Sequence, residues 1–281
     1  MKIFNTIKDI KAEISIAGQK GERVGFVPTM GALHKGHISL IEKAKSESDK
    51  VVCSIFVNPI QFNDSSDLEK YPRTLESDIQ KLKDAGCDIV FVPEVKEMYP
   101  DTVQESYNFG QLEEVMEGPL RPGHFNGVAV VVKRLFEIVE PHKAFFGEKD
   151  FQQLAIIRCL VENLKIPVEI VGCPIVREHD GLAMSSRNVR LSESERSLAH
   201  NIHKALSEAK NISKETDNVS EVKDSVFAHV GSMPEFRMEY FEIVNDKTLQ
   251  PITSFKETDG VVGCTAIWLG NVRLIDMIRF K

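Results

Sequence analysis

The sequence of 281 residues lacks any long hydrophobic run. Its longest unbroken aliphatic stretch is Val128–Val132, whereas a transmembrane helix needs roughly 20 apolar residues. The first residues, Met1–Asn5, turn polar within a few positions and do not form the apolar segment of a secretory signal. We therefore expect a protein that has no membrane partner.

Cysteine is scarce, with five residues at positions 53, 87, 159, 173 and 264. The number is odd and no two of them form a CxxC pair, which argues against a zinc or redox site built from cysteine. Several lie in apolar runs such as Val51–Ile55. We predict reduced, mostly buried thiols in a cytoplasmic protein.

Positive charge is also not in excess, since 35 Lys and Arg face 42 Asp and Glu, giving a net charge of −7. Binding to the nucleic-acid backbone depends on neutralising phosphates, so we expect no nucleic-acid partner. The apolar share of 42% and the charged share of 27% are ordinary for a globular protein and exclude a disordered or fibrous chain. A small local anion site stays possible.

Short apolar segments alternate with segments of helical periodicity up to about residue 176. Such alternation, with strands that are apolar throughout, predicts a parallel sheet covered on both faces. Ligands of these sheets bind outside the carboxyl ends of the strands. The predicted strands are 24–27, 51–57, 89–92, 144–146 and 168–171. One predicted helix is capped by Thr6 and another begins at His37; three more are predicted at 75–82, 128–138 and 151–164.

The pattern changes in the last third of the chain. Ser192 and Glu195 form a capping box that predicts a long helix through Ala209. The polar stretch 211–220 is predicted to be a loop, and a helix near 219–230 follows. Three strands are predicted after it, at 236–245, 261–268 and 271–279, with a Gly270-Asn271 turn joining the last two. The fold class is therefore α/β: a Rossmann-like parallel-sheet domain (1–175) with a smaller C-terminal α+β lid domain (176–281) carrying a short antiparallel sheet.

The segment Pro28–His37 (PTMGALHKGH) carries the clearest chemistry, because it follows a predicted strand and opens a helix. The N–H groups and the dipole of a helix N-terminus attract anions, and Gly36 lets the backbone approach a ligand closely. His34 and His37, three residues apart, could both donate to one phosphate. The alternative is an ordinary strand–helix turn with two surface histidines.

Two other interpretations of this loop are weaker. Gly31 and Gly36 have the glycine spacing of a Walker A loop, but His37-Ile38 stands where that loop needs Lys and Ser or Thr. A zinc site needs three or four ligands, and no Cys or further His close in the sequence completes one.

Together with four later segments, this loop resembles the pantothenate synthetase (pantoate–β-alanine ligase) family of the HxGH nucleotidylyltransferase superfamily. The later segments appear in the family's order and are FVNPIQF (56–62), GPLRPGHF (118–125), FGEKDFQQ (146–153) and MSSRN (184–188). The resemblance implies an ATP-dependent ligase in which pantoate attacks the α-phosphate of ATP, and β-alanine then displaces AMP from pantoyl adenylate to give pantothenate. It also implies magnesium and a homodimer.

Two other function classes remain open at this point. One is a different HxGH nucleotidylyltransferase, acting on another small acid or on a phosphate acceptor. The other is a non-catalytic nucleotide- or RNA-binding module, against which the acidic charge and the intact histidine loop both weigh. The residues are compatible with adenylation, because a carboxylate nucleophile needs no general base and no catalytic triad is evident.

The resemblance implies an ATP site and a set of groups that stabilise its charge. The MSSR segment resembles the synthetase KMSKS loop, with Ala183 and Arg187 in place of its two lysines. Asp150 is expected near the ribose, although it could instead cap the next helix. The catalytic candidates are His34, His37, Lys149 and Arg187, and the ATP-binding candidates are Met30, His34, Gly36, His37, Gly147, Lys149, Asp150, Val176, Met184, Ser185, Ser186 and Arg187.

The resemblance likewise implies a site for pantoate and β-alanine. Its candidates are Gln61, Gln153, Met30, Asn58 and Arg121. Met30 could equally be a core methionine, and Arg121 a structural loop residue. Asp78 resembles a family acid near magnesium and is the single metal candidate; a solvated helical acid is the alternative.

Overall fold

The computed structural model describes residues 1–281, which form two compact units. The first contains Met1–Phe109, Arg121–Gly147 and Ile156–Pro174, and the second contains Gly110–Leu120, Glu148–Ala155 and Ile175–Lys281. The last division, after Pro174, lies at the predicted domain boundary. The segments 110–120 and 148–155 were predicted to belong to the first domain, but their contacts group them with the C-terminal residues.

The first unit is built on a six-stranded sheet in which every pair of neighbouring strands is parallel, as predicted. Its strands are β1 (Lys2–Phe4), β2 (Val24–Thr29), β3 (Lys50–Ile55), β4 (Ile89–Phe91), β5 (Lys143–Gly147) and β6 (Glu169–Cys173). The order across the sheet is β1-β4-β3-β2-β5-β6. The chain moves outward from β2 through β3 to β4 and later returns to β5 on the other side of β2. The direction therefore switches beside β2, where such sheets bind ligands at their carboxyl edge.

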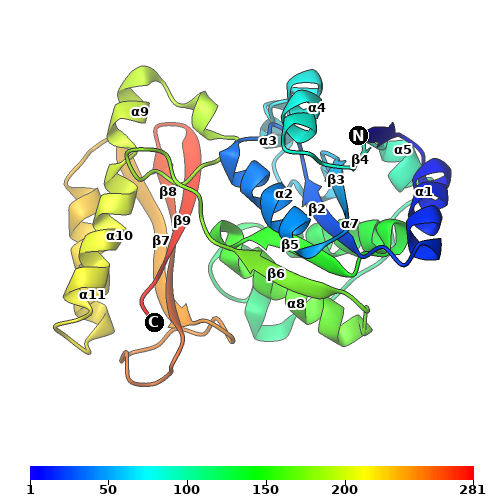
Figure 1. Cartoon of the computed structure of the whole chain (residues 1–281). Helices are drawn as coiled ribbons and strands as arrows, with labels where there is room; N and C mark the ends of the chain where they lie inside the picture. Colours follow the sequence, from blue (N-terminus) through cyan, green and yellow to red (C-terminus); the bar gives the residue numbers. More distant parts are fainter. The chain divides into compact units, whose positions relative to one another are not determined.

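Helices cover both faces of this sheet (Figure 1). They are α1 (Ile7–Gln19), α2 (Lys35–Glu47), α3 (Ser65–Glu69), α4 (Leu75–Asp84), α5 (Val95–Met98), α7 (His124–Val139) and α8 (Phe151–Leu164). The first residues of α8 belong to the second unit. A 3-10 turn, η1 (Pro59–Gln61), follows β3. The hydroxyl of Thr6 accepts the N–H of Asp9 at 3.2 Å and caps α1, as predicted. The strand β1 and the short helices α3 and α5 were not predicted, since so few residues give no periodicity to detect.

Alternation along the strands assigns the helices to opposite faces. Val27 of β2 belongs to a buried cluster with Ile41 of α2 and Leu82 of α4. Its neighbour Phe26 points the other way and packs against Phe136 of α7, with the ring centroids 6.3 Å apart. The sheet is therefore apolar on both sides, which explains its unbroken hydrophobic strands.

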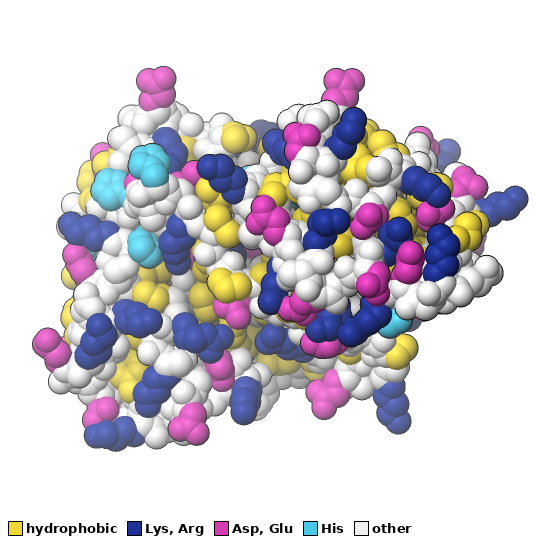
Figure 2. Space-filling view, in the orientation of Figure 1, with side chains coloured by type: hydrophobic (Ala, Val, Ile, Leu, Met, Phe, Trp, Pro, Cys, Tyr) yellow, Lys and Arg dark blue, Asp and Glu magenta, His cyan; other side chains and the backbone are white.

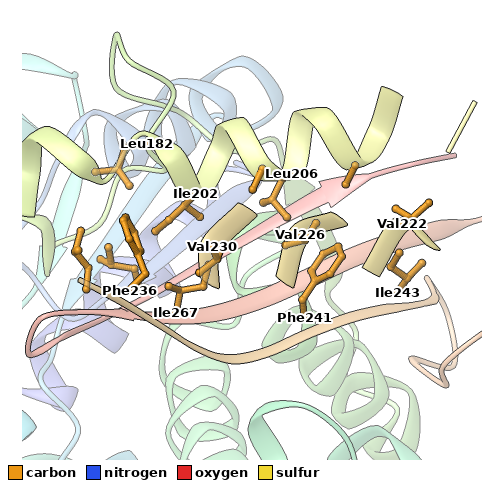
Figure 3. Close-up of a cluster of buried hydrophobic side chains, with 14 of the residues drawn as sticks. Leu182, Ile202, Leu206, Val222, Val226, Val230, Phe236, Phe241, Ile243 and Ile267 are labelled. Atoms are coloured by element: carbon orange, nitrogen blue, oxygen red, sulfur yellow. The ribbon is translucent and has the colours of Figure 1, made fainter. Parts of the chain in front are cut away.

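The second unit contains a three-stranded antiparallel sheet, as predicted. Its elements are β7 (Phe236–Asn245), β8 (Val261–Leu269) and β9 (Val272–Arg279), the helices α6 (Glu117–Leu120), α9 (Glu193–Leu198), α10 (Asn201–Ile212) and α11 (Val219–Gly231), and the 3-10 turns η2 (Gly110–Glu113), η3 (Glu148–Asp150) and η4 (Asn188–Arg190). Figure 3 shows side chains of α10 and α11, among them Ile202, Leu206 and Val226, facing Phe241 and Ile267 of the sheet. These contacts form the core of the unit.

The helix predicted from Ser192 through Ala209 is two helices. The capping box forms, since the Ser192 hydroxyl accepts the Glu195 N–H at 3.3 Å. The break follows because the His200 ring bonds the Ser197 carbonyl at 2.9 Å and the Asn201 amide bonds the Leu198 carbonyl at 2.9 Å. Side chains thereby occupy carbonyls that a continuous helix would use.

Four of the five cysteines are buried, as predicted: Cys53, Cys87, Cys173 and Cys264. Figure 2 shows Lys and Arg side chains interspersed with Asp and Glu over the face in view. Among the helices of the chain, none combines the length and the apolar character that crossing a bilayer would require.

Candidate active site

The loop after β2 has a tightly specified backbone. Gly31 and Ala32 both have left-handed φ angles, +80° and +50°, a conformation that glycine adopts freely and alanine does not. The Thr29 hydroxyl accepts the Gly31 N–H at 3.2 Å and also donates to the Ser54 carbonyl of β3 at 2.7 Å. This bend carries the chain from the end of β2 to His34, the N-cap of α2.

His34 and His37 form a capping box at the start of α2. The Nδ1 atom of His34 accepts the Gly36 N–H at 3.2 Å, and the Nδ1 atom of His37 accepts the His34 N–H at 3.3 Å. With each Nδ1 acting as an acceptor, the ring proton belongs on Nε2. The rings lie 4.1 Å apart between centroids. The pair therefore carries two Nε2–H donors at a helix N-terminus, where an anion is favoured.

Asp78, in the first turn of α4, binds the backbone of this loop. Its carboxylate is fully buried and accepts the backbone N–H groups of Ala32 and Leu33, each at 2.8 Å. The Thr74 hydroxyl donates to the same carboxylate at 3.1 Å, and Lys81, which lies 3.8 Å from it, donates to the Leu33 carbonyl at 2.7 Å. Three hydrogen bonds thus tie α4 to the backbone that precedes His34.

The surroundings of Asp78 do not fit the magnesium ligand suggested by the sequence. Mg²⁺ keeps several waters and demands octahedral oxygen geometry, whereas both oxygens of this buried carboxylate already accept hydrogen bonds. No group of three or more His, Cys, Asp or Glu side chains gathers as metal ligands anywhere in the chain. We therefore derive no step of the reaction through a protein-held metal.

Gln61 lies in η1, directly after β3, and its side-chain amide has a partner at each end. Its Oε1 accepts from the Nδ2 of Asn58 at 3.1 Å, and its Nε2 lies 3.1 Å from the sulfur of Met30. Asn58 is buried. The structure thus brings together Met30, Asn58 and Gln61, three of the predicted substrate-binding residues, from the ends of the neighbouring strands β2 and β3.

Arg121 reaches this group through a histidine that the sequence reasoning missed. The Nη1 of Arg121 lies 3.1 Å from Nε2 of His124, and Nδ1 of the same ring lies 2.8 Å from the backbone carbonyl of Gln61. Because a carbonyl only accepts, Nδ1 carries the proton and Nε2 accepts from the guanidinium. His124 stands inside the GPLRPGHF segment, but nothing in the sequence alone indicated that it would contact Gln61.

Glycine at position 127 lets η1 lie against α7. A Cβ atom there would come within 2.4 Å of the Ile60 carbonyl oxygen and 2.6 Å of the Gln61 Cα. Both atoms are backbone, so they could not move aside cheaply. The backbone carbonyl of Gly127 also accepts from Asn58 at 3.1 Å.

The segment that carries Lys149, Asp150 and Gln153 belongs to the second unit and starts immediately after Gly147 at the end of β5. The Lys149 ammonium lies 3.9 Å from the Asp150 carboxylate. Asp150 is the last residue of η3 and directly precedes Phe151, the first residue of α8. Gln152, which directly precedes Gln153 in the sequence, is buried. Its side chain accepts the Glu117 N–H at 2.9 Å and donates to the carbonyls of Leu112 and Val115.

Glu117 continues this connection to the antiparallel sheet. Its carboxylate forms a bidentate pair with Arg273 of β9, at 2.7 and 2.9 Å, and accepts the Tyr240 hydroxyl of β7 at 2.7 Å. Arg273 also pairs with Glu239, which accepts from Trp268 at 2.9 Å. No local pattern in the sequence indicates this network, because its members are up to 156 positions apart. It fixes the Lys149 segment to the C-terminal strands.

The MSSR segment is held in the same unit. Met184 donates its N–H to the Val176 carbonyl at 3.0 Å, so these two predicted ATP-binding residues are neighbours. Between them, Arg177 forms a bidentate pair with the buried Asp276 of β9, at 2.7 and 3.0 Å. The Ser185 hydroxyl accepts the Arg187 N–H at 3.2 Å.

The predicted residues therefore form two groups. One is in the first unit and contains Met30, His34, Gly36, His37, Asn58, Gln61, Arg121 and Gly147; the other is in the second unit and contains Lys149, Asp150, Gln153, Val176 and Met184–Arg187. Each group is anchored by buried hydrogen bonds within its own unit.

Known proteins resemble the chain over its whole length. The family model described as Pantoate-beta-alanine ligase matches residues 2–279. A protein named pantothenate synthetase from Bacteroides fragilis is 51% identical over 281 residues, covering 100% of this chain and 99% of its own. The crystal structure of pantothenate synthetase from Thermus thermophilus has a TM-score of 0.94 at 43% identity, with 100% of both chains covered. The crystal structure of a pantoate-beta-alanine ligase from Francisella tularensis, complexed with beta-gamma ATP and beta-alanine, has a TM-score of 0.80 at 36% identity, with 100% of this chain and 98% of that chain covered.

Proposed function

The chain belongs to the pantoate-beta-alanine ligase family, and from that premise we propose how its residues carry out the reaction. The enzyme joins pantoate to β-alanine at the expense of ATP, which leaves as AMP and pyrophosphate. The full-length likeness supports this function over that of another HxGH nucleotidylyltransferase.

In the first step the pantoate carboxylate attacks the α-phosphate of ATP and pyrophosphate leaves. The carboxylate is already ionised at neutral pH, so the enzyme needs no general base here. What it must supply is position and donors for the charge that builds on the phosphate oxygens. We assign that task to the Nε2–H groups of His34 and His37, whose Nδ1 atoms are engaged by the backbone. This arrangement is the observation that carries the proposal.

Lys149 and Arg187 supply the remaining positive charge in our proposal. An ammonium acts as a compact charge, whereas a guanidinium donates in a fork that suits phosphate oxygens. Both residues belong to the second unit, as do Asp150, Val176, Met184, Ser185 and Ser186, which we propose to contact the nucleotide. Gly36 and Gly147 leave room for the phosphates beside the backbone.

We propose that Gln61 and Gln153 bind pantoate, with Asn58 and Arg121 supporting them. Gln61 also borders the position from which the β-alanine amine attacks the acyl carbon in the second step, releasing AMP. Met30 contacts Gln61 through its sulfur, and its thioether suits the gem-dimethyl group of pantoate. No residue is assigned to magnesium, which we expect to arrive with ATP as part of the substrate.

The family resemblance also leads us to propose a homodimer that works in the cytoplasm. Light scattering of the purified protein measures the first of these directly. A mass near 31.6 kDa, that of one chain, would contradict it.

Pantoate-dependent exchange between ATP and labelled pyrophosphate tests the adenylation step. The enzyme is incubated with ATP, magnesium and D-pantoate without β-alanine. We expect label to enter ATP only when pantoate is present. Exchange that does not depend on pantoate, or no exchange, would contradict the adenylate mechanism.

A further inference from the structure

A chain of side-chain hydrogen bonds leads from Tyr99 to Gln61. The Tyr99 hydroxyl donates to Oδ1 of Asn58 at 2.9 Å, and Nδ2 of Asn58 donates to Oε1 of Gln61 at 3.1 Å. All three residues belong to the first unit, and Asn58, in the middle, is 1% exposed. Little solvent reaches the central amide, so its partners decide which way it faces.

A backbone group fixes the direction of this chain. Nδ2 of Asn58 also donates to the carbonyl of Gly127 at 3.1 Å, and a carbonyl can only accept. If the Asn58 amide were reversed, its oxygen would face two acceptors, Gly127 O and Gln61 Oε1, and its NH₂ group would face the Tyr99 hydroxyl. The observed orientation satisfies all of these groups.

The orientation of Asn58 then dictates that of Gln61. Because Asn58 presents N–H, Gln61 must turn its oxygen toward it, and its NH₂ group is left on the opposite side. There the NH₂ group donates to the Met30 sulfur at 3.1 Å, and a thioether is a weak acceptor. An oxygen of a bound acid or alcohol would accept this N–H more strongly than the sulfur does.

We propose that Tyr99 is a positioning residue: by donating to Oδ1 of Asn58 it reinforces the amide orientation that the Gly127 carbonyl requires, so that Gln61 meets the substrate as a donor to an oxygen. The inference rests on the proposed role of Gln61 in binding pantoate. Tyr99 is remote in sequence and acts only through Asn58.

Tyr99 is suited to act as a permanent donor. Burial raises the pKa of its phenol above the usual value, so the hydroxyl keeps its proton under any physiological condition. The ring packs edge-on against Phe56, with centroids 6.1 Å apart, which holds the hydroxyl in place. Replacing Tyr99 by Phe removes the donor and keeps this packing.

The test is a double-mutant cycle read by pantoate-dependent ATP–pyrophosphate exchange. Tyr99→Phe should raise the KM for pantoate about 10-fold, the effect of one lost hydrogen bond, and leave the KM for ATP within about twofold. In a Gln61→Ala background the same substitution should change nothing further, because Tyr99 acts through Gln61. Tyr107→Phe is the matched control, since the Tyr107 hydroxyl donates to Glu105 at an exposed position.

The outcomes separate this inference from the proposed function. If Gln61→Ala leaves the KM for pantoate unchanged, the role of Gln61 itself is wrong. If Gln61→Ala raises it but Tyr99→Phe has no effect, or adds its full effect in both backgrounds, Gln61 binds pantoate and the positioning role of Tyr99 is overturned. If Tyr99→Phe folds poorly, Asn58→Asp serves as a second variant. The new carboxylate can only accept, so the Gln61 amide should turn its NH₂ group toward it and its oxygen toward the substrate. The resulting rise in the KM for pantoate should again disappear in a Gln61→Ala background.

Discussion

The carboxylate of Asp78 accepts the backbone N–H of Leu33 at 2.8 Å, and so a side chain of α4 fixes the loop that ends at His34. The bond joins residues 45 positions apart. Together with the bond to Ala32 it holds two consecutive N–H groups in a bend whose φ angles are positive. The geometry of the two histidines therefore depends on an acid that need not touch the substrate.

Asp78→Asn should disturb both stability and adenylation. An amide nitrogen would face a backbone N–H, leaving a buried donor without an acceptor, which costs about 1–3 kcal/mol. Urea unfolding measures this loss, and the exchange rate should fall on the order of 10-fold as the histidines shift. Asp84→Asn, at an exposed position of the same helix, is the control.

A magnesium titration of Asp78→Asn separates anchoring from metal binding. An anchor predicts a lower maximal rate with the same magnesium concentration at half-maximum. A shift of that midpoint by 10-fold or more would restore Asp78 as a metal ligand.

His37→Asn separates the capping role of this histidine from its role as a donor. The Asn oxygen can replace Nδ1 as the acceptor for the His34 N–H, but nothing replaces Nε2–H. We expect nearly unchanged thermal unfolding and an exchange rate lowered on the order of 10²–10³-fold, as for other lost charge stabilisers. Equal activity in the variant and the parent enzyme would remove His37 from the proposed machinery.

Gly127→Ala should weaken pantoate binding without touching the substrate. The new methyl group would press on the backbone of Ile60 and Gln61, and overpacking of this kind costs about 1–3 kcal/mol. The KM for pantoate should rise several-fold, measured in the same exchange assay. Gly18→Ala, where a Cβ meets nothing within 4 Å, should leave both KM values as they are.

Glu117→Gln should destabilise the second unit. It replaces one of the two carboxylates that pair with Arg273 by a neutral amide, while Glu239 stays paired with the guanidinium, and weakening hydrogen bonds to a charged group in this way should cost about 1.5–3 kcal/mol. The half-exposed pair of Lys223 and Glu242 offers a contrast, since Lys223→Met should cost less than about 1 kcal/mol. Chemical unfolding of the two variants compares them directly, and equal losses would contradict the importance of the Glu117 network.

The stability of the enzyme should fall in acid partly through Glu47 at the end of α2. Hydrogen bonds from Lys143 and then Lys43 lower the pKa of Glu47 from 4.5 to about 2. A lowered pKa means that the native state favours the ionised form, so the stabilisation is present above pH 4.5 and is lost as the pH falls toward 2. Thermal unfolding of Glu47→Gln should therefore differ from the parent above pH 5 and converge with it near pH 2. A constant difference over that range would contradict the assignment.

The alternating strands and helices could be predicted because each element carries its own signal. The buried strands β2 to β5 are unbroken apolar runs, and the caps at Thr6 and Ser192 are local pairs of residues. The helix break at 199–200 could not be predicted, because it arises where His200 and Asn201 bond carbonyls that a helix would normally use. Polar side chains such as these are compatible with either outcome in a sequence.

The candidate site was predicted as motifs, whereas its supports were not. His34, Gln61 and Lys149 stand in recognisable segments. Asp78 as a loop anchor, His124 against Gln61 and Glu117 against Arg273 depend on contacts between residues 45 to 156 positions apart. No local pattern records such pairings, and only the folded backbone brings them together.

The second unit is assembled from three separate stretches of the chain, which limits how it can be exchanged between relatives. A fragment starting at Ile175 would contain Arg273 and Tyr240 but not Glu117, and it would lack Phe151, on whose ring the Arg279 guanidinium lies at 5.6 Å. A chimera that takes its C-terminal domain from another enzyme must therefore take residues 110–120 and 148–155 from the same parent. Residues 110–120, 148–155 and 175–281 can therefore be replaced only together.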